Sequence, residues 1–175
     1  MIAWAIMANH FSEGKRPEVR IHIISVGRRM PGWVEDGYAE YAKRMPHECA
    51  LNLIEIEPFR RGRSTSAEQA REEEGRRILK AIPKGAGVTV LDVLGQSWST
   101  ERLAGHLTGW LGAGCDRALL VGGPDGLARE CLDRADQCWS LSALTFPHPL
   151  VRVVLAEQIY RAWTLNQGHP YHRGG

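Results

Sequence analysis

Apolar residues along the chain gather in short runs, and longer segments that mix apolar and polar positions separate these runs. The runs are rich in Val, Ile and Leu and end at glycine, proline or polar residues, which is typical of β-strands. The predicted strands are 20–26, 51–56, 88–94, 118–121 and a short one near Trp139. Because residues 88–94 are nearly all apolar, this strand is expected to be covered on both faces.

Helix signals lie in the segments between these runs. Pro31 is favoured in a first helical turn, Thr65 and Glu68 have the spacing of a capping box, and Thr100 can cap a helix. The predicted helices are about 31–45, 65–82, 100–111, 127–135 and 149–165. Strands that alternate with helices predict an α/β fold with a mostly parallel sheet flanked by helices.

The start of the chain differs from the rest. Residues 1–8 are apolar but short, and residues 9–19 are polar and contain Gly14 and Pro17, which is typical of a linker. We expect residues 1–19 to form a flexible N-terminal extension. Because 175 residues suit one domain better than two, residues 20–175 are expected to form a single domain.

Composition excludes several classes of protein. Hydrophobic residues make up 43% of the chain and charged residues 24%, which is near the globular average and excludes a disordered or collagen-like chain. No apolar run reaches the roughly 18 residues of a membrane span, and the N-terminus lacks the basic region of a secretory signal. The four cysteines show no Cys-x-x-Cys spacing, so we expect buried thiols of a cytosolic protein.

The net charge of +2 is small, but its distribution is uneven. Segments 20–63 and 141–175 are mildly basic, and the segment between them is mildly acidic. If the protein has a polyanionic partner, that partner is expected to bind at the two flanking segments. Ordinary scatter in surface charge is the alternative explanation.

A glycine-rich turn at 122–126 is a candidate ligand site. It follows an apolar strand and precedes a helix, and ligands in open α/β sheets bind at the carboxyl ends of strands. A tight turn without a ligand is the alternative. The other glycine pairs, at 85–87 and 112–114, precede strands rather than follow them, so they do not form a dinucleotide-binding fingerprint.

The C-terminal segment carries the strongest signal. Residues 140–145 alternate small polar and apolar side chains, which suits an adenine held by backbone groups and apolar walls. The helix after this loop is apolar almost all round, so it must be buried on more than one side, and we interpret it as a homodimer interface. Glu157 and Arg161 have the i, i+4 spacing of a stabilising ion pair on this helix.

The tail 169–173 reads His-Pro-Tyr-His-Arg. A frayed terminus is one interpretation. The other is contact with a nucleic-acid substrate, in which an aromatic ring stacks on a base and Arg173 meets a phosphate. His169 and His172 have a spacing that could ligate a metal, but no cysteine or carboxylate lies near them in sequence, so no metal is expected.

Five stretches of the chain carry a family resemblance. They are VGRRMPGWV (26–34), LIEI (53–56), LLVGGPDGL (119–127), WSLSALTFPHPLVRVVLAEQIYRAW (139–163) and HPYHR (169–173). From Arg20 to Arg173 the chain resembles the SPOUT class of RNA methyltransferases. Within that class it is similar to the RlmH family, the pseudouridine N3-methyltransferases of large-subunit ribosomal RNA.

The resemblance implies a fold and a cofactor. The parallel sheet would end in a C-terminal trefoil knot, an exception to the rule that folds are unknotted. The enzyme would be a homodimer that uses S-adenosylmethionine, bound in the knot. The implied cofactor-binding residues are Leu91, Gly122, Leu141, Ser142, Ala143, Leu144, Thr145 and Phe146. They include the glycine turn and the 140–145 loop that the residue pattern indicates independently.

The resemblance also implies a substrate, a pseudouridine in large-subunit ribosomal RNA within assembled ribosomes. Tyr171, His172 and Arg173 would reach the target base; we interpret His172 as the residue that assists deprotonation or orients the base, and Arg173 as a cation for developing charge or phosphate. The candidates for RNA backbone contact are Arg28, Arg29, Arg60, Arg61 and Arg63. The 19-residue extension and the final two glycines depart from the family pattern.

Two alternative functions stay open at this point. One is a SPOUT methyltransferase that acts on another RNA, such as transfer RNA. The other is a non-enzymatic ribosome-binding factor of the same fold. An intact cofactor loop at 139–146 argues against a pure binding factor. The small size argues for a large structured substrate, because a minimal enzyme has no added RNA-binding domain.

Overall fold

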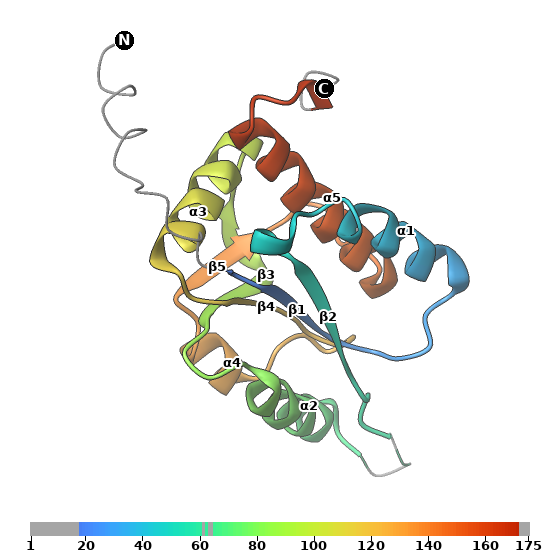
Figure 1. Cartoon of the computed structure of the whole chain (residues 1–175). Coiled ribbons are helices and arrows are strands. Elements are labelled where there is room, and N and C mark those ends of the chain that lie inside the picture. Colours follow the sequence, from blue (N-terminus) through green and yellow to red (C-terminus); the bar gives the residue numbers. More distant parts are fainter. Residues whose placement is uncertain (1–17, 61, 63–64, 172–175) are drawn as a thin grey trace.

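The computed structural model of the chain describes residues 18–60, 62 and 65–171. Its centre is a five-stranded sheet in the order β2-β1-β4-β3-β5, and every pair of neighbouring strands is parallel. The strands are β1 (Ile21–Val26), β2 (Leu51–Ile56), β3 (Gly87–Ser97), β4 (Arg117–Val121) and β5 (Gln137–Ser140). The predicted α/β fold with a mostly parallel sheet is confirmed (Figure 1).

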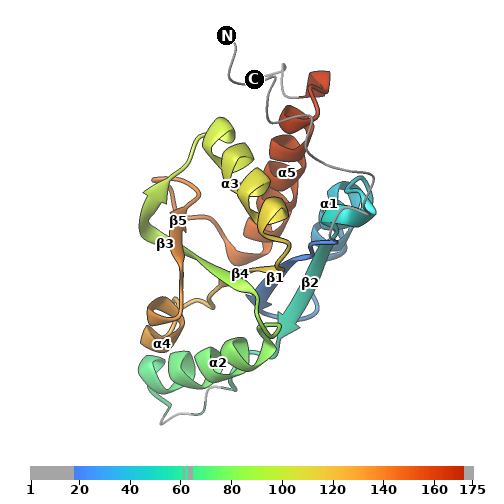
Figure 2. The same ribbon diagram turned by 60° about the vertical axis from the view of Figure 1, so that its left-hand side comes forward.

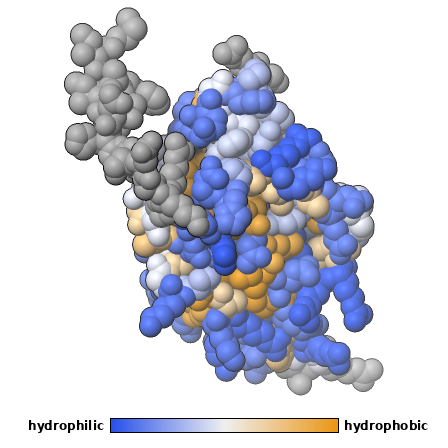
Figure 3. Space-filling model, in the orientation of Figure 1, coloured by the Kyte–Doolittle hydropathy of each residue, from blue (hydrophilic) through white to orange (hydrophobic). Residues whose placement is uncertain are grey.

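Helices cover both faces of the sheet. Helices α1, α3 and α5 form one layer and α2 and α4 the other, as the two ribbon views show (Figure 1, Figure 2). The helices are α1 (Gly32–Ala42), α2 (Ala67–Ala81), α3 (Thr100–Ala113), α4 (Arg129–Asp133) and α5 (His148–Asn166), with a short 3-10 turn, η2, at His47–Cys49. In Figure 3 hydrophilic residues cover the helices, and apolar residues reach the surface between the two layers.

The central strands β1 and β4 are buried along their whole length, because each is covered on both faces and paired on both edges. The register pairs Val26 with Ile56 and Ser25 with Val121. The carboxyl ends of β1, β2 and β4 therefore lie side by side at one edge of the sheet. Loops that leave these strands converge there.

Strand β3 departs from the expected strand 88–94. Both Leu91 and Gln96 pair with Trp139, so the four residues between them bulge out of the sheet. As a result Val93 is 67% exposed and Leu94 is 92% exposed. The expectation that both faces of the strand are covered is confirmed for residues 88–90. It is wrong for the residues after them, because the bulge carries these residues out from between the two helix layers.

Two helix caps lie one residue away from their predicted positions. The hydroxyl of Ser66, rather than Thr65, accepts from the backbone N–H of Gln69, and the Gln69 side chain accepts from the Ser66 N–H. Likewise Ser99, rather than Thr100, caps α3. The capping pattern occurs in two overlapping registers in each segment, and local spacing does not choose between them. Helix α1 also ends at Ala42, before the expected residue 45.

Helix α5 packs on the sheet between α1 and α3 (Figure 1). Its Arg152 is 1% exposed, and the guanidinium donates to Glu55 Oε1 at 2.6 Å and to Gly27 O at 2.8 Å. Glu157 and Arg161 form the expected ion pair, with Arg161 Nη2 2.6 Å from Glu157 Oε1. The apolar residues of α5 are all buried or half-buried within its own chain.

The described part of the chain begins inside the expected N-terminal extension. Val19 is fully buried, and its N–H donates to Glu48 O at 3.1 Å. Among the described helices none is long and apolar enough to cross a membrane. All four cysteines are free thiols: Cys49 and Cys131 are buried and Cys138 is half-buried, but Cys115 is exposed in the loop before β4, so the expectation of burial is wrong there.

Candidate functional site

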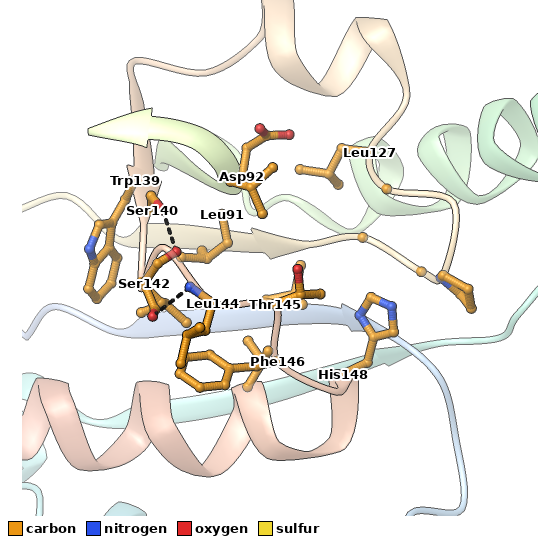
Figure 4. A pocket seen from close by; sticks show the side chains of 18 residues that line it. Leu91, Asp92, Leu127, Trp139, Ser140, Ser142, Leu144, Thr145, Phe146 and His148 are labelled. Atoms are coloured by element: carbon orange, nitrogen blue, oxygen red, sulfur yellow. Dashed lines mark hydrogen bonds between the residues drawn. The ribbon is translucent and has the colours of Figure 1, made fainter. Parts of the chain in front are cut away.

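A pocket of about 270 Å³ lies at the carboxyl edge of the sheet. Its walls come from the middle of β3, where the bulge begins, the glycine turn after β4, the loop after β5 and the start of α5 (Figure 4). These segments are far apart in sequence, and the parallel register brings their ends together. The volume is near the lower end of the range typical of ligand pockets.

The predicted cofactor-binding residues gather at this pocket. Those that line it are Leu91, Gly122, Leu141, Ser142, Leu144, Thr145 and Phe146. The exception is Ala143, which is exposed and does not line the pocket. Trp139, within the expected cofactor loop, lines it too, and so do Asp92, Leu127 and His148, which the sequence analysis did not select. His148 had a usable signal, because it opens the helix that follows the loop.

The glycine turn has a conformation that side chains would block. Gly126 N donates to Gly123 O at 2.9 Å, which closes a four-residue turn, and Gly126 has a φ of +83°. A Cβ at Gly122 would lie 2.6 Å from the Gly126 carbonyl carbon. The turn therefore presents bare backbone to the pocket.

Hydrogen bonds within the loop after β5 fix its shape. Ser140 Oγ donates to Ser142 O at 3.1 Å, and Ser142 Oγ accepts from Leu144 N at 2.9 Å (Figure 4). Behind the loop, Trp139 stacks on Trp98 with ring centroids 4.8 Å apart. Because both the loop and the aromatic wall are held by these contacts, the apolar side of the pocket is preformed.

Few of the residues that line the pocket are polar. None of these lining residues is a lysine or an arginine. Asp92 Oδ1 accepts from Leu94 N at 2.8 Å, which holds the start of the β3 bulge. Burial lowers the pKa of His148, Glu74 opposes this shift and Arg152 adds to it, so His148 is neutral at pH 7. The pocket thus carries acidic and neutral groups rather than cations.

The structure does not bring Tyr171 to this pocket. Its hydroxyl donates to Glu157 Oε1 at 3.3 Å, and its ring meets the Tyr160 ring edge-on at 4.9 Å. Burial raises the pKa of Tyr171 to about 12, with Tyr41 and Glu157 acting in the same direction. Since Val151 is the last residue of α5 that lines the pocket, Tyr160 lies about 13 Å further along the helix axis. His172 and Arg173 lie outside the described residues.

The described basic candidates lie at the same edge of the sheet as the pocket. Arg28 and Arg29 follow β1, and Arg60 follows β2, and all three are exposed. Arg28 Nη1 donates to Glu57 Oε2 at 2.9 Å. Arg29 has a φ of +54°, a left-handed conformation that costs a non-glycine residue energy. Arg61 and Arg63 fall outside the described part of the chain.

Metal ligands were not expected, and the described residues contain no group of three or more His, Cys, Asp or Glu side chains that could hold a metal ion. His169 Nδ1 accepts from the backbone N–H of Tyr171 at 3.2 Å.

A comparison with protein families decides where this arrangement belongs. The family model described as "Predicted SPOUT methyltransferase" matches residues 19–172, nearly the whole chain. The chain belongs to the SPOUT methyltransferase family. A C-terminal trefoil knot, which the sequence resemblance implies, is a property of this family. The match begins at the buried Val19.

Curated relatives within the SPOUT family are close. The Ribosomal RNA large subunit methyltransferase H of Thioalkalivibrio sulfidiphilus is 58% identical over 155 residues, covering 89% of this chain and 99% of the relative. The protein of the same name from Alkalilimnicola ehrlichii is 59% identical with the same coverage. A solved structure of a probable methylase family protein from Haemophilus influenzae is 12% identical with a TM-score of 0.52, covering 90% of this chain and 71% of that one, and supports the fold alone.

Proposed function

We propose that this protein transfers a methyl group from S-adenosylmethionine to N3 of a pseudouridine in large-subunit ribosomal RNA. The observation that carries the proposal is the 58% identity to a protein named Ribosomal RNA large subunit methyltransferase H over 99% of that protein's length. The substrate form is the assembled ribosome, and the reaction takes place in the cytoplasm. This is the function that the sequence resemblance implies.

The pocket fits the proposed cofactor. Leu91, Leu127 and Phe146 provide apolar walls for an adenine, and the loop at 141–145 adds backbone groups at its edge. Bare backbone at Gly122 allows close approach of the ribose or the amino-acid part. The absence of lysine and arginine from the pocket lining suits a cofactor that carries a positive sulfonium.

Methyl transfer mainly requires that the reacting groups are aligned. When bound, the cofactor supplies a methyl group already activated by the sulfonium, so no covalent protein nucleophile is required. The protein must hold the base nitrogen in line with the methyl carbon and exclude water, which is a positioning task. The ring N–H must also lose its proton, and we assign this step to His172, with Arg173 as the cation for the developing charge. Tyr171, neutral at pH 7, serves as a hydrogen-bonding or stacking residue.

We propose that the active form is a homodimer. Tyr171 is held against Glu157 and Tyr160, about 13 Å along α5 from the pocket, and the backbone of two further residues spans no more than about 7 Å. A second copy can place its tail there instead. The exposed apolar side chains Val93 and Leu94 on the β3 bulge and Leu144 at the pocket rim, together with the half-buried face of α5, form the contact surface.

Ribosomal RNA is expected to bind across the edge of the sheet where the pocket opens. Arg28, Arg29 and Arg60 lie at this edge, and Arg61 and Arg63 belong to the same basic loop in sequence. Phosphate contacts from arginine place the RNA without reading its sequence. The structured ribosome then supplies most of the specificity.

The deciding experiment is transfer of labelled methyl from S-adenosylmethionine to RNA. Assembled ribosomes from a strain without this enzyme, separated subunits and bulk transfer RNA are offered in parallel, and mass spectrometry identifies the product nucleoside. We expect label on a pseudouridine of the large-subunit RNA in assembled ribosomes. Label on transfer RNA would move the activity to another substrate, and cofactor binding without any label would favour a binding role.

A further inference from the structure

A buried carboxylate lies directly behind the glycine turn of the pocket. Glu74, in the middle of α2, is 3% exposed, and its Oε1 accepts from the backbone N–H of Phe59 at 2.9 Å. The other oxygen, Oε2, has no hydrogen-bond partner among the described residues. A Cβ built on Gly123 would come within 2.7 Å of Oε2, and Gly123 itself lines the pocket. One glycine residue therefore separates the unpartnered oxygen from the pocket.

Among the described residues, Arg77 of α2 and Arg152 of α5 are paired with groups other than Glu74. Arg77, one turn along α2, donates to Glu57 O at 2.8 Å and pairs with Glu73. Arg152 is held by Glu55 at 2.6 Å. Glu74 acts electrostatically on His148, but burial lowers the pKa of His148, which is therefore uncharged near pH 7. A buried carboxylate without a cation is costly to a fold unless a ligand supplies the opposite charge.

We propose that Glu74 is a specificity-determining residue that favours the positively charged methyl donor over the neutral product through the thin backbone of the glycine turn. S-adenosylmethionine carries a sulfonium, and S-adenosylhomocysteine carries a neutral thioether at the same position. A negative charge one residue behind the pocket wall attracts the sulfonium of S-adenosylmethionine. It has no comparable attraction for the neutral thioether of S-adenosylhomocysteine. Loss of the methyl group then removes the attraction and aids release of the product. This inference rests on the proposed function.

Gly123 contributes to the same preference for a positively charged ligand. A side chain there would collide with Oε2, so the position keeps Glu74 and the pocket at their closest separation. Because the intervening material is backbone and excludes water, the field of the carboxylate is weakly screened. The neighbouring Glu73 has the same charge, but it faces Arg76 and Arg77 at the surface. It is a matched control on the same helix.

The test measures binding rather than activity. Isothermal titration calorimetry on the full chain compares S-adenosylmethionine, S-adenosylhomocysteine and sinefungin, an analogue with an amine-bearing carbon in place of the sulfonium. For Glu74→Gln we expect about tenfold weaker binding of the two cationic ligands and unchanged binding of S-adenosylhomocysteine, from the loss of one charge at an effective dielectric constant of about 20. Glu73→Gln is expected to leave all three affinities unchanged, and Glu74→Asp, which keeps the charge, to restore the preference for cations.

Equal weakening of all three ligands in Glu74→Gln, or none, would overturn the proposal, since a merely structural role does not distinguish charge. Should that variant fail to fold, the unmodified protein still gives a result. An analogue with a tertiary amine in place of the sulfonium should take up a proton on binding, seen as buffer-dependent heats, and the absence of uptake contradicts the idea. Failure of the unmodified protein to bind any of these ligands would instead refute the proposed cofactor.

Discussion

Arg152 of α5, which is buried, and Glu55 of β2, whose side chain is 35% exposed, form an ion pair with Nη1 2.6 Å from Oε1 that links the last helix to the edge strand of the sheet. The same guanidinium also donates to Gly27 O at 2.8 Å, where the chain leaves β1. One side chain thus joins α5, β1 and β2 at the edge where the pocket opens. The ends of these elements are held in a fixed relation.

Replacement of Arg152 by alanine is expected to cost about 1–3 kcal/mol in the free energy of unfolding, because the carbonyl oxygens of Val26 and Gly27 lose their donor and the partly exposed Glu55 loses its cation. Urea denaturation followed by circular dichroism measures the loss. Arg129→Ala is the control, since Arg129 is 81% exposed and pairs with Asp133 at the surface. Similar free energies of unfolding of the two variants would show that the contacts of Arg152 contribute little to stability.

Gly122→Ala is expected to abolish cofactor binding, because its Cβ would lie 2.6 Å from the backbone of Gly126 and deform the turn. Calorimetry with S-adenosylmethionine measures the effect. Gly105→Ala in α3 is the matched control, as no atom lies within 4 Å of its Cβ position, and alanine there is expected to be neutral or to stabilise the helix. Full affinity in Gly122→Ala would rule out a role for this turn in binding.

The stability of the protein is expected to fall as the pH is lowered through the range in which His148 titrates. Burial lowers the pKa of His148, so the unfolded chain takes up a proton at a higher pH than the folded one. The contribution is therefore fully present above about pH 6.5 and is lost as the pH falls towards the folded pKa. His148→Gln, which does not titrate, should lose less stability than the unmodified chain between about pH 7.5 and pH 5.5.

Burial also lowers the pKa of His106, so part of this pH dependence is expected to persist in the His148→Gln variant. His106→Gln alone measures that part. A pH dependence of unfolding that is identical in the His148→Gln variant and the unmodified chain would contradict the prediction for His148.

The double variant His172→Ala with Arg173→Ala is expected to lower the rate of methyl transfer by about 10²–10⁴-fold, the usual contribution of general acid–base groups. Cofactor affinity should stay unchanged if these residues act on the target base alone. Single-turnover kinetics on ribosomes, with calorimetry on the same preparations, separates the two effects. An unchanged turnover rate would remove both residues from the mechanism.

Local patterns predicted the elements whose ends carry a strong signal. The strand expected at 51–56 matches β2, since a run of alternating large residues stops before Pro58. The cap of α2 is Ser66 rather than the predicted Thr65. Both residues begin a capping pattern, and only the structure shows that the hydrogen bond is made by Ser66. The bulge in β3 was not predictable, because it depends on which residues of β3 pair with Trp139, on a strand formed much later in the chain.

In the site, too, some residues could be predicted from local sequence and others depend on tertiary packing. The predicted cofactor-binding residues come from the family resemblance, together with the glycine turn and the loop after β5, and the structure gathers all of them but Ala143 at one pocket. Glu74 gave no signal, because it lies in a run of glutamates that resembles a solvated helix face. Its burial depends on the packing of α2 against the sheet and the glycine turn, which local sequence does not encode.

The parallel register has a consequence for how the chain is made. Strand β1 is among the first elements to leave the ribosome, but its central neighbour β4 follows much later, with Ile21 paired to Arg117, 96 residues further on. At about 5–20 residues per second β1 waits roughly 5–20 s for this partner. During synthesis the nascent chain therefore depends on β2 or on chaperones to cover a strand that is completely hidden in the finished protein.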